Sequence, residues 1–209
     1  SFSSINDYPV KDEKIRGIGK SLPINEMVIL DEDGLEVADN CEGEICIRGY
    51  NVSNEYLGLS GQNNLSFKNG WFHSGDYGKK DEKGYFHFNG RKDSLIIKGG
   101  ENIYPAELEN ILFKHPGIAE CAVIGIPDKI LGEEVCAFVK LKGKMDYTES
   151  DIKSYCKDKI AFFKQPKKII IIDNYDDLID IPKGPTKKVL YRELKNYYIN
   201  NMNKLNNYN

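Results

Sequence analysis

Hydrophobic and polar residues alternate in short runs through the first half of the chain, with the two-residue period of a β-strand. These runs predict strands at residues 26–30, 44–48, 71–74, 85–88 and 95–97. A polar stretch ending in Gly84 separates two of the runs and is typical of a hairpin turn. We expect no helix longer than one turn before residue 104.

In the second half, runs with helical spacing alternate with apolar runs. A proline in the first turn and apolar residues after it predict a helix at residues 105–114. Thr148 and Asp151 form a capping-box pattern at the start of a second helix. A third helix is expected from Lys188 to about Leu205, and the Asn-rich end favours fraying. Apolar runs predict strands at residues 119–126, 135–140 and 169–172.

The change of pattern near Asp93 predicts two structural units and an α+β fold class. Residues 1–92 are expected to form a β-rich unit, and residues 93–209 a small α/β domain. With 209 residues, the chain is long enough for either one domain or two small ones.

Composition narrows the class of protein further. Lysine and arginine number 29 against 32 acidic residues, and this balance disfavours a nucleic-acid-binding protein. We find no apolar run long enough to span a membrane and no secretory signal pattern, so we expect a cytoplasmic location. The five cysteines are expected to be reduced and used as small apolar side chains. Cys41 and Cys46 have no histidine near them in the sequence, and we predict no metal site. The three histidines (His73, His87 and His115) are dispersed, and a structural role is expected for them.

Three segments carry a family resemblance. They are residues 70–76 (Gly-Trp-Phe-His-Ser-Gly-Asp), residues 90–109, which include Gly-Gly-Glu-Asn-Ile-Tyr-Pro, and residues 182–192, which begin Pro-Lys-Gly-Pro-Thr-Lys-Lys. In order and spacing, the chain resembles the adenylate-forming superfamily of acyl-CoA synthetases, firefly luciferases and peptide-synthetase adenylation domains. The resemblance extends from about Gly17 to Leu194.

The resemblance implies a two-step ligation that uses ATP, Mg²⁺ and CoA. A carboxylic acid reacts with ATP to form acyl-AMP, and the CoA thiol then displaces AMP. Residues 1–92 would be the last, β-rich subdomain of the family's large domain, a distorted barrel. Residues 93–209 would be the complete C-terminal lid, which rotates between the two steps.

The resemblance also assigns roles to three residues near the predicted boundary. Asp76 matches the carboxylate that accepts hydrogen bonds from both ribose hydroxyls, and Arg91 matches a residue beside the nucleotide. An inter-strand salt bridge is the alternative for Arg91. Asp93 matches the hinge of the lid, with a plain turn residue as the alternative.

In the lid, Gly99 and Gly100 match the loop that lines the pantetheine tunnel, although a tight turn would also require glycine. Phe163 and Lys167 match positions that contact CoA in some relatives, and a solvated basic loop is the alternative. Lys188 matches the catalytic lysine that approaches the α-phosphate during adenylation. The family normally has Gly just before that lysine, whereas this chain has Lys187, which would take the role if the register slips.

The family's phosphate loop and its Tyr-Gly-x-Thr-Glu segment have no match in these residues. We therefore expect the C-terminal part of an acid–CoA ligase that is inactive alone. Its partners would be upstream N-terminal adenylation subdomains that hold most of the Mg²⁺ ligands and the acid pocket. A luciferase-like or peptide-synthetase-type enzyme, or a non-catalytic binding module, remains the alternative. The joint presence of Asp76, Arg91 and Lys188 favours an enzyme.

Overall fold

A computed structural model describes residues 4–5, 17–143, 145–175 and 178–201. The chain divides into two compact units, Ser1–Asp93 and Ser94–Asn209. The α+β class expected from the sequence is confirmed, since the first unit is mainly β-sheet and the second combines a sheet with helices.

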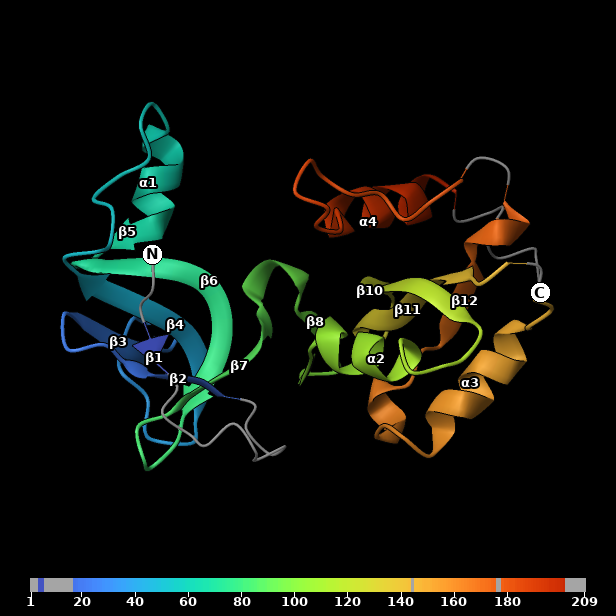
Figure 1. Cartoon of the computed structure of the whole chain (residues 1–209), viewed down its shortest axis with the longest axis horizontal. Helices are drawn as coiled ribbons and strands as arrows, with labels where there is room; N and C mark the ends of the chain where they lie inside the picture. The colour runs from blue at the N-terminus through green and yellow to red at the C-terminus, as the bar shows by residue number, and fades with distance from the viewer. Residues whose placement is uncertain (1–3, 6–16, 144, 176–177, 202–209) are drawn as a thin grey trace. The chain divides into compact units, whose positions relative to one another are not determined.

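The first unit is a strongly curled seven-stranded sheet in the order β1-β2-β7-β6-β4-β3, with β5 paired to β6 (Figure 1). Its strands are β1 (Ser4–Ile5), β2 (Gly17–Ser21), β3 (Asn25–Leu30), β4 (Glu42–Gly49), β5 (Phe67–Lys68), β6 (Trp71–Lys80) and β7 (Phe86–Arg91). Met27, Ile29, Ile45 and Phe86 form its apolar core. The predicted strands at 26–30, 44–48, 71–74 and 85–88 are therefore all present, and β6 is longer than expected.

One expectation for this unit is wrong. Helix α1 (Ser60–Ser66) spans seven residues, although no helix longer than a turn was expected before residue 104. Its sequence is polar, has no buried residue and has no side-chain cap. A helix without an apolar stripe or a capping residue leaves no periodic signal in the sequence.

The second unit contains a five-stranded sheet in the order β10-β11-β8-β9, with β12 parallel to β11. Its strands are β8 (Ile96–Lys98), β9 (Glu101–Ile103), β10 (Ile118–Asp128), β11 (Gly132–Leu141) and β12 (Lys168–Ile171). Its helices are α2 (Pro105–Leu112), α3 (Glu149–Lys157) and α4 (Tyr191–Asn200). Single 3₁₀ turns are η1 (Lys92–Ser94), η2 (Phe162–Lys164) and η3 (Ile172–Asn174).

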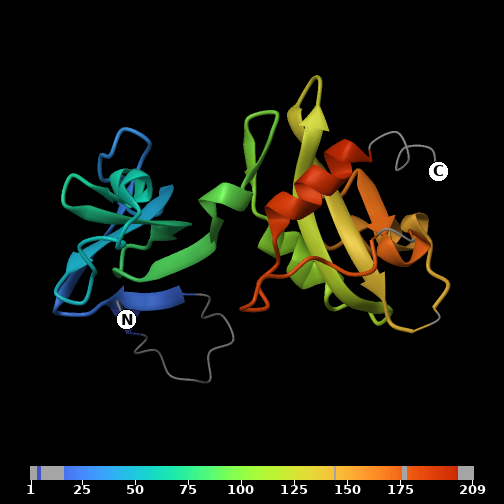
Figure 2. The same ribbon diagram turned by 90° about the horizontal axis from the view of Figure 1, so that it is seen from above.

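Both faces of this sheet are covered, because alternate residues of the long strands point to opposite sides. Helices α2 and α3 pack on the face that carries Val123 and Ala137. Helix α4 packs on the other face, which carries Ile124 and Phe138, and Figure 2 shows it lying along the sheet. The fully buried Leu194 of α4 contributes about 1.5–3 kcal/mol by leaving water.

Local signals account for where two of these helices begin. Pro105 is the first residue of α2, and Thr148 and Asp151 form the predicted reciprocal capping box of α3. Helix α4 begins at Tyr191 rather than at the predicted Lys188, because Val189 pairs with Lys183 in a β-bridge. The predicted end near Leu205 and the fraying of the Asn-rich end lie outside the described residues. Within the described residues, no helix is both long and apolar enough to cross a membrane.

Candidate functional site

Asp76 and Arg91, predicted from separate motifs, lie opposite each other on β6 and β7. Arg91 Nη1 donates to Asp76 Oδ1 at 2.8 Å and to the carbonyl oxygen of Ser74 at 3.1 Å. The inter-strand salt bridge considered for Arg91 is therefore present. Because both side chains remain partly exposed, both can still meet a ligand.

Asp76 lies in an irregular stretch of strand β6, residues 74–76, where the register against β4 shifts; we call this stretch the Ser74–Asp76 turn, and Gly75 is at its centre. Gly75 has φ +72°, and a Cβ there would lie 3.1 Å from Arg91 Nη2. On one side of it, the Ser74 hydroxyl donates to the carbonyl oxygen of Ile45 at 2.6 Å and accepts from the amide of Asp76 at 3.0 Å. The local backbone thus places the Asp76 carboxylate beside Arg91.

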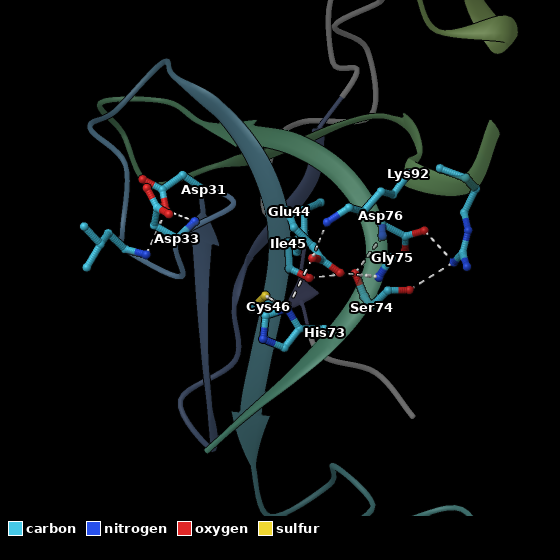
Figure 3. Close-up of polar contacts among 12 residues, drawn as sticks. Asp31, Asp33, Glu44, Ile45, Cys46, His73, Ser74, Gly75, Asp76 and Lys92 are labelled. Atoms are coloured by element: carbon cyan, nitrogen blue, oxygen red, sulfur yellow. Dashed lines mark hydrogen bonds and ion pairs between the residues drawn. The ribbon is translucent and has the colours of Figure 1, made fainter. Parts of the chain in front are cut away.

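A buried carboxylate, Glu44, lies beside this turn and is bonded to it (Figure 3). Glu44 Oε1 accepts the Gly75 N–H at 3.0 Å, and Glu44 Oε2 lies 3.2 Å from His73 Nδ1 and 3.5 Å from Lys92 Nζ. Burial raises the pKa of Glu44, but hydrogen bonds from His73 and Gly75 and the charge of Lys92 outweigh it and leave the pKa below its usual value. Glu44 is therefore an ionised anchor for the turn.

Cys46 has no histidine near it in the sequence, but the fold brings His73 into contact with it. His73 Nδ1 is 3.4 Å from Cys46 Sγ, and the ligand atoms of Glu44, Cys46 and His73 lie within 4.8 Å of one another. Burial raises the pKa of Cys46 to about 12 in the absence of a metal ion, and Lys92 Nζ lies 3.5 Å from Glu44 Oε2. These side chains form a hydrogen-bonded network. His73 has the structural role expected for it.

A cleft of about 440 Å³ lies beside this turn. Its lining residues include Glu44, His73, Ser74, Gly75, Arg91 and Lys92. Its volume falls within the range of about 300–1,000 Å³ that is usual for small-molecule sites. Its wall carries three cations (Lys68, Arg91 and Lys92) and four carboxylates (Asp31, Glu32, Asp33 and Glu44), so it suits a polar ligand.

Gly99 and Gly100 form the two-residue turn between β8 and β9. Their φ angles are +59° and +88°, as a type I′ hairpin turn requires. Lys98 pairs with Glu101 on the two sides of the turn, and the Gly99 amide donates to the carbonyl oxygen of Leu131 at 2.8 Å. The tight-turn explanation for these glycines therefore holds. A side chain at Gly100 would meet no neighbouring atom, so the turn leaves open space there.

Phe163 and Lys167 lie before β12. The Phe163 ring is exposed beside the Lys164 ammonium, which pairs with Glu107 Oε2 at 2.6 Å. Lys167 Nζ is 3.6 Å from Asp128 Oδ2, so its charge is shared with a carboxylate. Asp93 is the last residue of the first unit and lies in η1 with an exposed side chain.

Lys188 lies in a short hairpin, residues 182–190, that we call the lysine hairpin. The Gly184 amide donates to the carbonyl oxygen of Lys188, and the Leu190 amide donates to that of Pro182, each at 2.9 Å. Lys187 has φ +61°, a left-handed conformation that favours glycine. Lys187 is the position at which the resemblance expected Gly, and its φ is one that glycine adopts without strain.

Sequence reasoning missed Glu44, Lys92, Glu109 and Tyr191. Glu44 follows a Gly in a strand whose neighbours are apolar, and a charged residue at such a position is a weak signal of a buried ion pair. Glu109 and Tyr191 both lie inside the matched segments, but their contact joins residues 82 positions apart. Strand or helix periodicity cannot show such a contact.

Two known protein families match parts of this chain. The family described as "AMP-binding enzyme C-terminal domain" matches residues 107–188, and the family described as "AMP-binding enzyme" matches residues 1–57. The chain belongs to this adenylate-forming, AMP-binding enzyme family, and it matches the C-terminal part of such enzymes.

Among individual proteins, the chain is similar to acid–CoA ligases. It is 40% identical over 199 residues to an oxalate–CoA ligase of Arabidopsis thaliana, with 93% of this chain and 37% of that protein covered. It is 37% identical over 182 residues to a 2-succinylbenzoate–CoA ligase of Bacillus mycoides, with 87% and 36% covered. The chain thus spans just over a third of the length of these relatives.

A solved structure of o-succinylbenzoate CoA synthetase from Bacillus subtilis, in complex with its acyl-adenylate intermediate, has a TM-score of 0.78 and 36% identity to the chain. It covers 88% of this chain, which covers 36% of that one. The same enzyme has also been solved with ATP and magnesium ion.

Proposed function

We propose that this chain is the C-terminal part of an AMP-forming acid–CoA ligase. In the first step, a carboxylate oxygen attacks the α-phosphorus of ATP, and pyrophosphate leaves. In the second, the CoA sulfur attacks the acyl carbonyl, and AMP leaves. The observation that carries the proposal is the Asp76–Arg91 pair beside the 440 Å³ cleft.

The nucleotide would bind at this pair. The two oxygens of Asp76 can each accept a hydrogen bond from one hydroxyl of a vicinal diol, so the residue suits a ribose. Arg91 supplies a planar, permanently charged donor group for ribose or phosphate oxygens. Glu44 and Ser74 would hold the turn in this arrangement when the ligand arrives.

Lys188 would act during the first step. Its ammonium would approach the oxygens of the α-phosphate and the acid, where negative charge builds up on the pentavalent phosphorus. The left-handed φ of Lys187 supports this register, because Lys187 stands where the family uses Gly.

The second step would use the rest of the lid. Gly99 and Gly100 would leave room for the pantetheine arm, and the exposed Phe163 ring would stack on the CoA base. Lys167 would exchange its carboxylate partner for a CoA phosphate. Asp93, at the boundary of the two units, would be the hinge that lets residues 94–209 turn between the steps.

The ligase would use ATP, CoA and a carboxylic acid as substrates and Mg²⁺ as a cofactor. When bound, Mg²⁺ neutralises phosphate charge. Two of the carboxylates at this site already have a cation beside them, Arg91 at Asp76 and Lys92 at Glu44. This arrangement fits a metal held mainly by upstream subdomains, which would also bind the acid. We therefore propose that the 209-residue chain alone does not form acyl-AMP.

Lys188→Ala in the full-length ligase tests the proposal. Acyl-AMP formation should fall by about 10² or more, while thioester formation from supplied acyl-AMP should largely survive. Lys187→Ala is the matched control and should keep both activities. Equal loss of both half-reactions would exclude the role of Lys188, and a selective loss in the Lys187 variant would move the role to Lys187. A ligase with no acid-dependent release of AMP would instead indicate a non-catalytic module.

A further inference from the structure

Glu109 is a partly buried carboxylate that the proposed reaction does not use. It lies on α2, and its Oε1 accepts the amide N–H of Val123 at 2.9 Å. The Tyr191 hydroxyl donates to the same carboxylate, at 3.0 Å from Oε1 and 3.2 Å from Oε2. Burial raises the pKa of Glu109, and the bonds from Val123 and Tyr191 oppose this shift. One carboxylate thus joins α2, β10 and the start of α4.

Tyr191 is also the residue that follows the lysine hairpin. It is the first residue of α4, directly after Leu190, whose amide closes the hairpin on Pro182. Near the other end of the hairpin, Lys183 Nζ pairs with Glu120 Oε2 on β10 at 2.5 Å. The hairpin is therefore attached at both ends to the same region of the lid.

Both attachments lie at the base of the hairpin, away from Lys187 and Lys188. Internal hydrogen bonds join Gly184 to Lys188 and to Lys187, so the hairpin can turn as one piece. A rotation at its base would move the Lys188 backbone, and a misplacement of about 1 Å in a reacting geometry can lower a rate about 10²-fold. The side chain of Lys188 itself is exposed.

We infer that the hydrogen bond from Tyr191 to Glu109 positions Lys188 for adenylation, which makes Glu109 and Tyr191 positioning residues. The inference rests on the proposed function of Lys188. The hydroxyl-to-carboxylate bond is charge-assisted and therefore stronger and more directional than a neutral one. The hydrogen bond between Tyr191 and Glu109 would affect the half-reaction that uses Lys188. It would not affect the Gly99–Gly100 turn, which is held by its own contacts with the sheet.

The test is Tyr191→Phe in the full-length ligase, which removes the hydroxyl and keeps the ring. We expect acyl-AMP formation to fall about tenfold, less than in Lys188→Ala, and thioester formation from supplied acyl-AMP to stay within about twofold. The matched control is Lys195→Met, which breaks the 2.6 Å pair between α4 and Glu133 without touching the hairpin. The control should leave both half-reactions unchanged.

Two further measurements separate positioning from a merely structural role. The first uses Glu109→Gln, which keeps the size of the side chain. Because Glu109 and Tyr191 act through one bond, the variant that carries both Glu109→Gln and Tyr191→Phe should lose no more adenylation activity than Tyr191→Phe alone. Hydrogen exchange at the amides of Gly184 and Leu190 should become faster in Tyr191→Phe and stay unchanged in the control.

The outcomes also separate this inference from the proposed function. If Lys188→Ala impairs adenylation but Tyr191→Phe matches the wild type, or slows both half-reactions equally, the positioning role is wrong and the function stands. If the losses of adenylation in Glu109→Gln and Tyr191→Phe simply add in the double variant, the hydrogen bond between these two residues is not the cause. If Lys188→Ala spares adenylation, the proposed role of Lys188 fails first.

Discussion

Arg91 Nη1 lies 2.8 Å from Asp76 Oδ1 across neighbouring strands, yet the side chains are 50% and 36% exposed. An ion pair this open to solvent contributes only about 0–1 kcal/mol to stability. The pair therefore contributes little to the stability of the fold, which fits the nucleotide site that we propose for it.

Asp76→Asn should separate the contribution of Asp76 to stability from its proposed contribution to nucleotide binding. We expect the free energy of unfolding to change by less than about 1 kcal/mol. In the full-length ligase, the KM for ATP should rise at least about tenfold, because the amide keeps only one acceptor oxygen for the ribose. Glu26→Gln, which removes the exposed pair with Arg48 in the same sheet, should affect neither quantity by as much. An unchanged KM for ATP would contradict a nucleotide site at Asp76.

Lys187→Gly should stabilise the chain. Lys187 has φ +61°, and a left-handed backbone costs a residue with a Cβ roughly 1–2 kcal/mol. Glycine removes this strain, but it also gives the unfolded chain more conformational entropy, which offsets part of the gain in stability. We expect a net gain of up to about 1 kcal/mol in urea unfolding. The control Thr186→Gly, which is outside the left-handed region, should lose stability. A loss in the Lys187 variant would show that its side chain contributes more than the backbone strain costs.

The cysteines should differ sharply in reactivity. Burial raises the pKa of Cys46 and Cys121 to about 12 and that of Cys156 to about 11, and it also raises the pKa of Cys136. Cys41 is exposed. A thiol reagent at pH 7.5 should modify one cysteine quickly and the other four only after unfolding. Cys41→Ser should abolish the fast phase, and two fast thiols in the native chain would contradict the buried positions.

His115 should make stability depend on pH. Its Nδ1 accepts the Gly117 N–H at 3.1 Å, and the rings of Tyr147 and Tyr155 contact it edge-on. Burial, and then the charge of Lys159, lower the pKa of His115 below 6.5. Because the unfolded chain binds the proton more readily, the stabilisation is complete above about pH 6.5 and is lost as the pH falls below it.

Urea unfolding between pH 5 and 8 measures this effect. The wild type should lose stability over the lower part of the range, and His115→Gln should be less stable at pH 8 but lose less between pH 7 and 5. The wild-type slope in His115→Gln would place the titrating group elsewhere.

Much of the fold was predictable because its signals are local. Alternation gave the strands around Ile29 and Ile45, and Pro105 and Thr148 marked helix starts. Helix α1 was not predicted, because it has no buried side chain and so no apolar pattern. Helix α4 begins later in the chain than predicted, because Val189 is held in a β-bridge with Lys183. A long-range pairing of this kind overrides helical spacing.

Some residues of the candidate site were likewise predictable from local sequence, and others were not. The family resemblance of three sequence motifs assigned roles to Asp76, Arg91 and Lys188, and each motif is a local segment of the chain. Only the tertiary structure brought Glu44 into contact with Gly75 and Tyr191 into contact with Glu109. These contacts depend on strand register and on the packing of α4, which bring together residues far apart in the chain, so no local pattern could predict them.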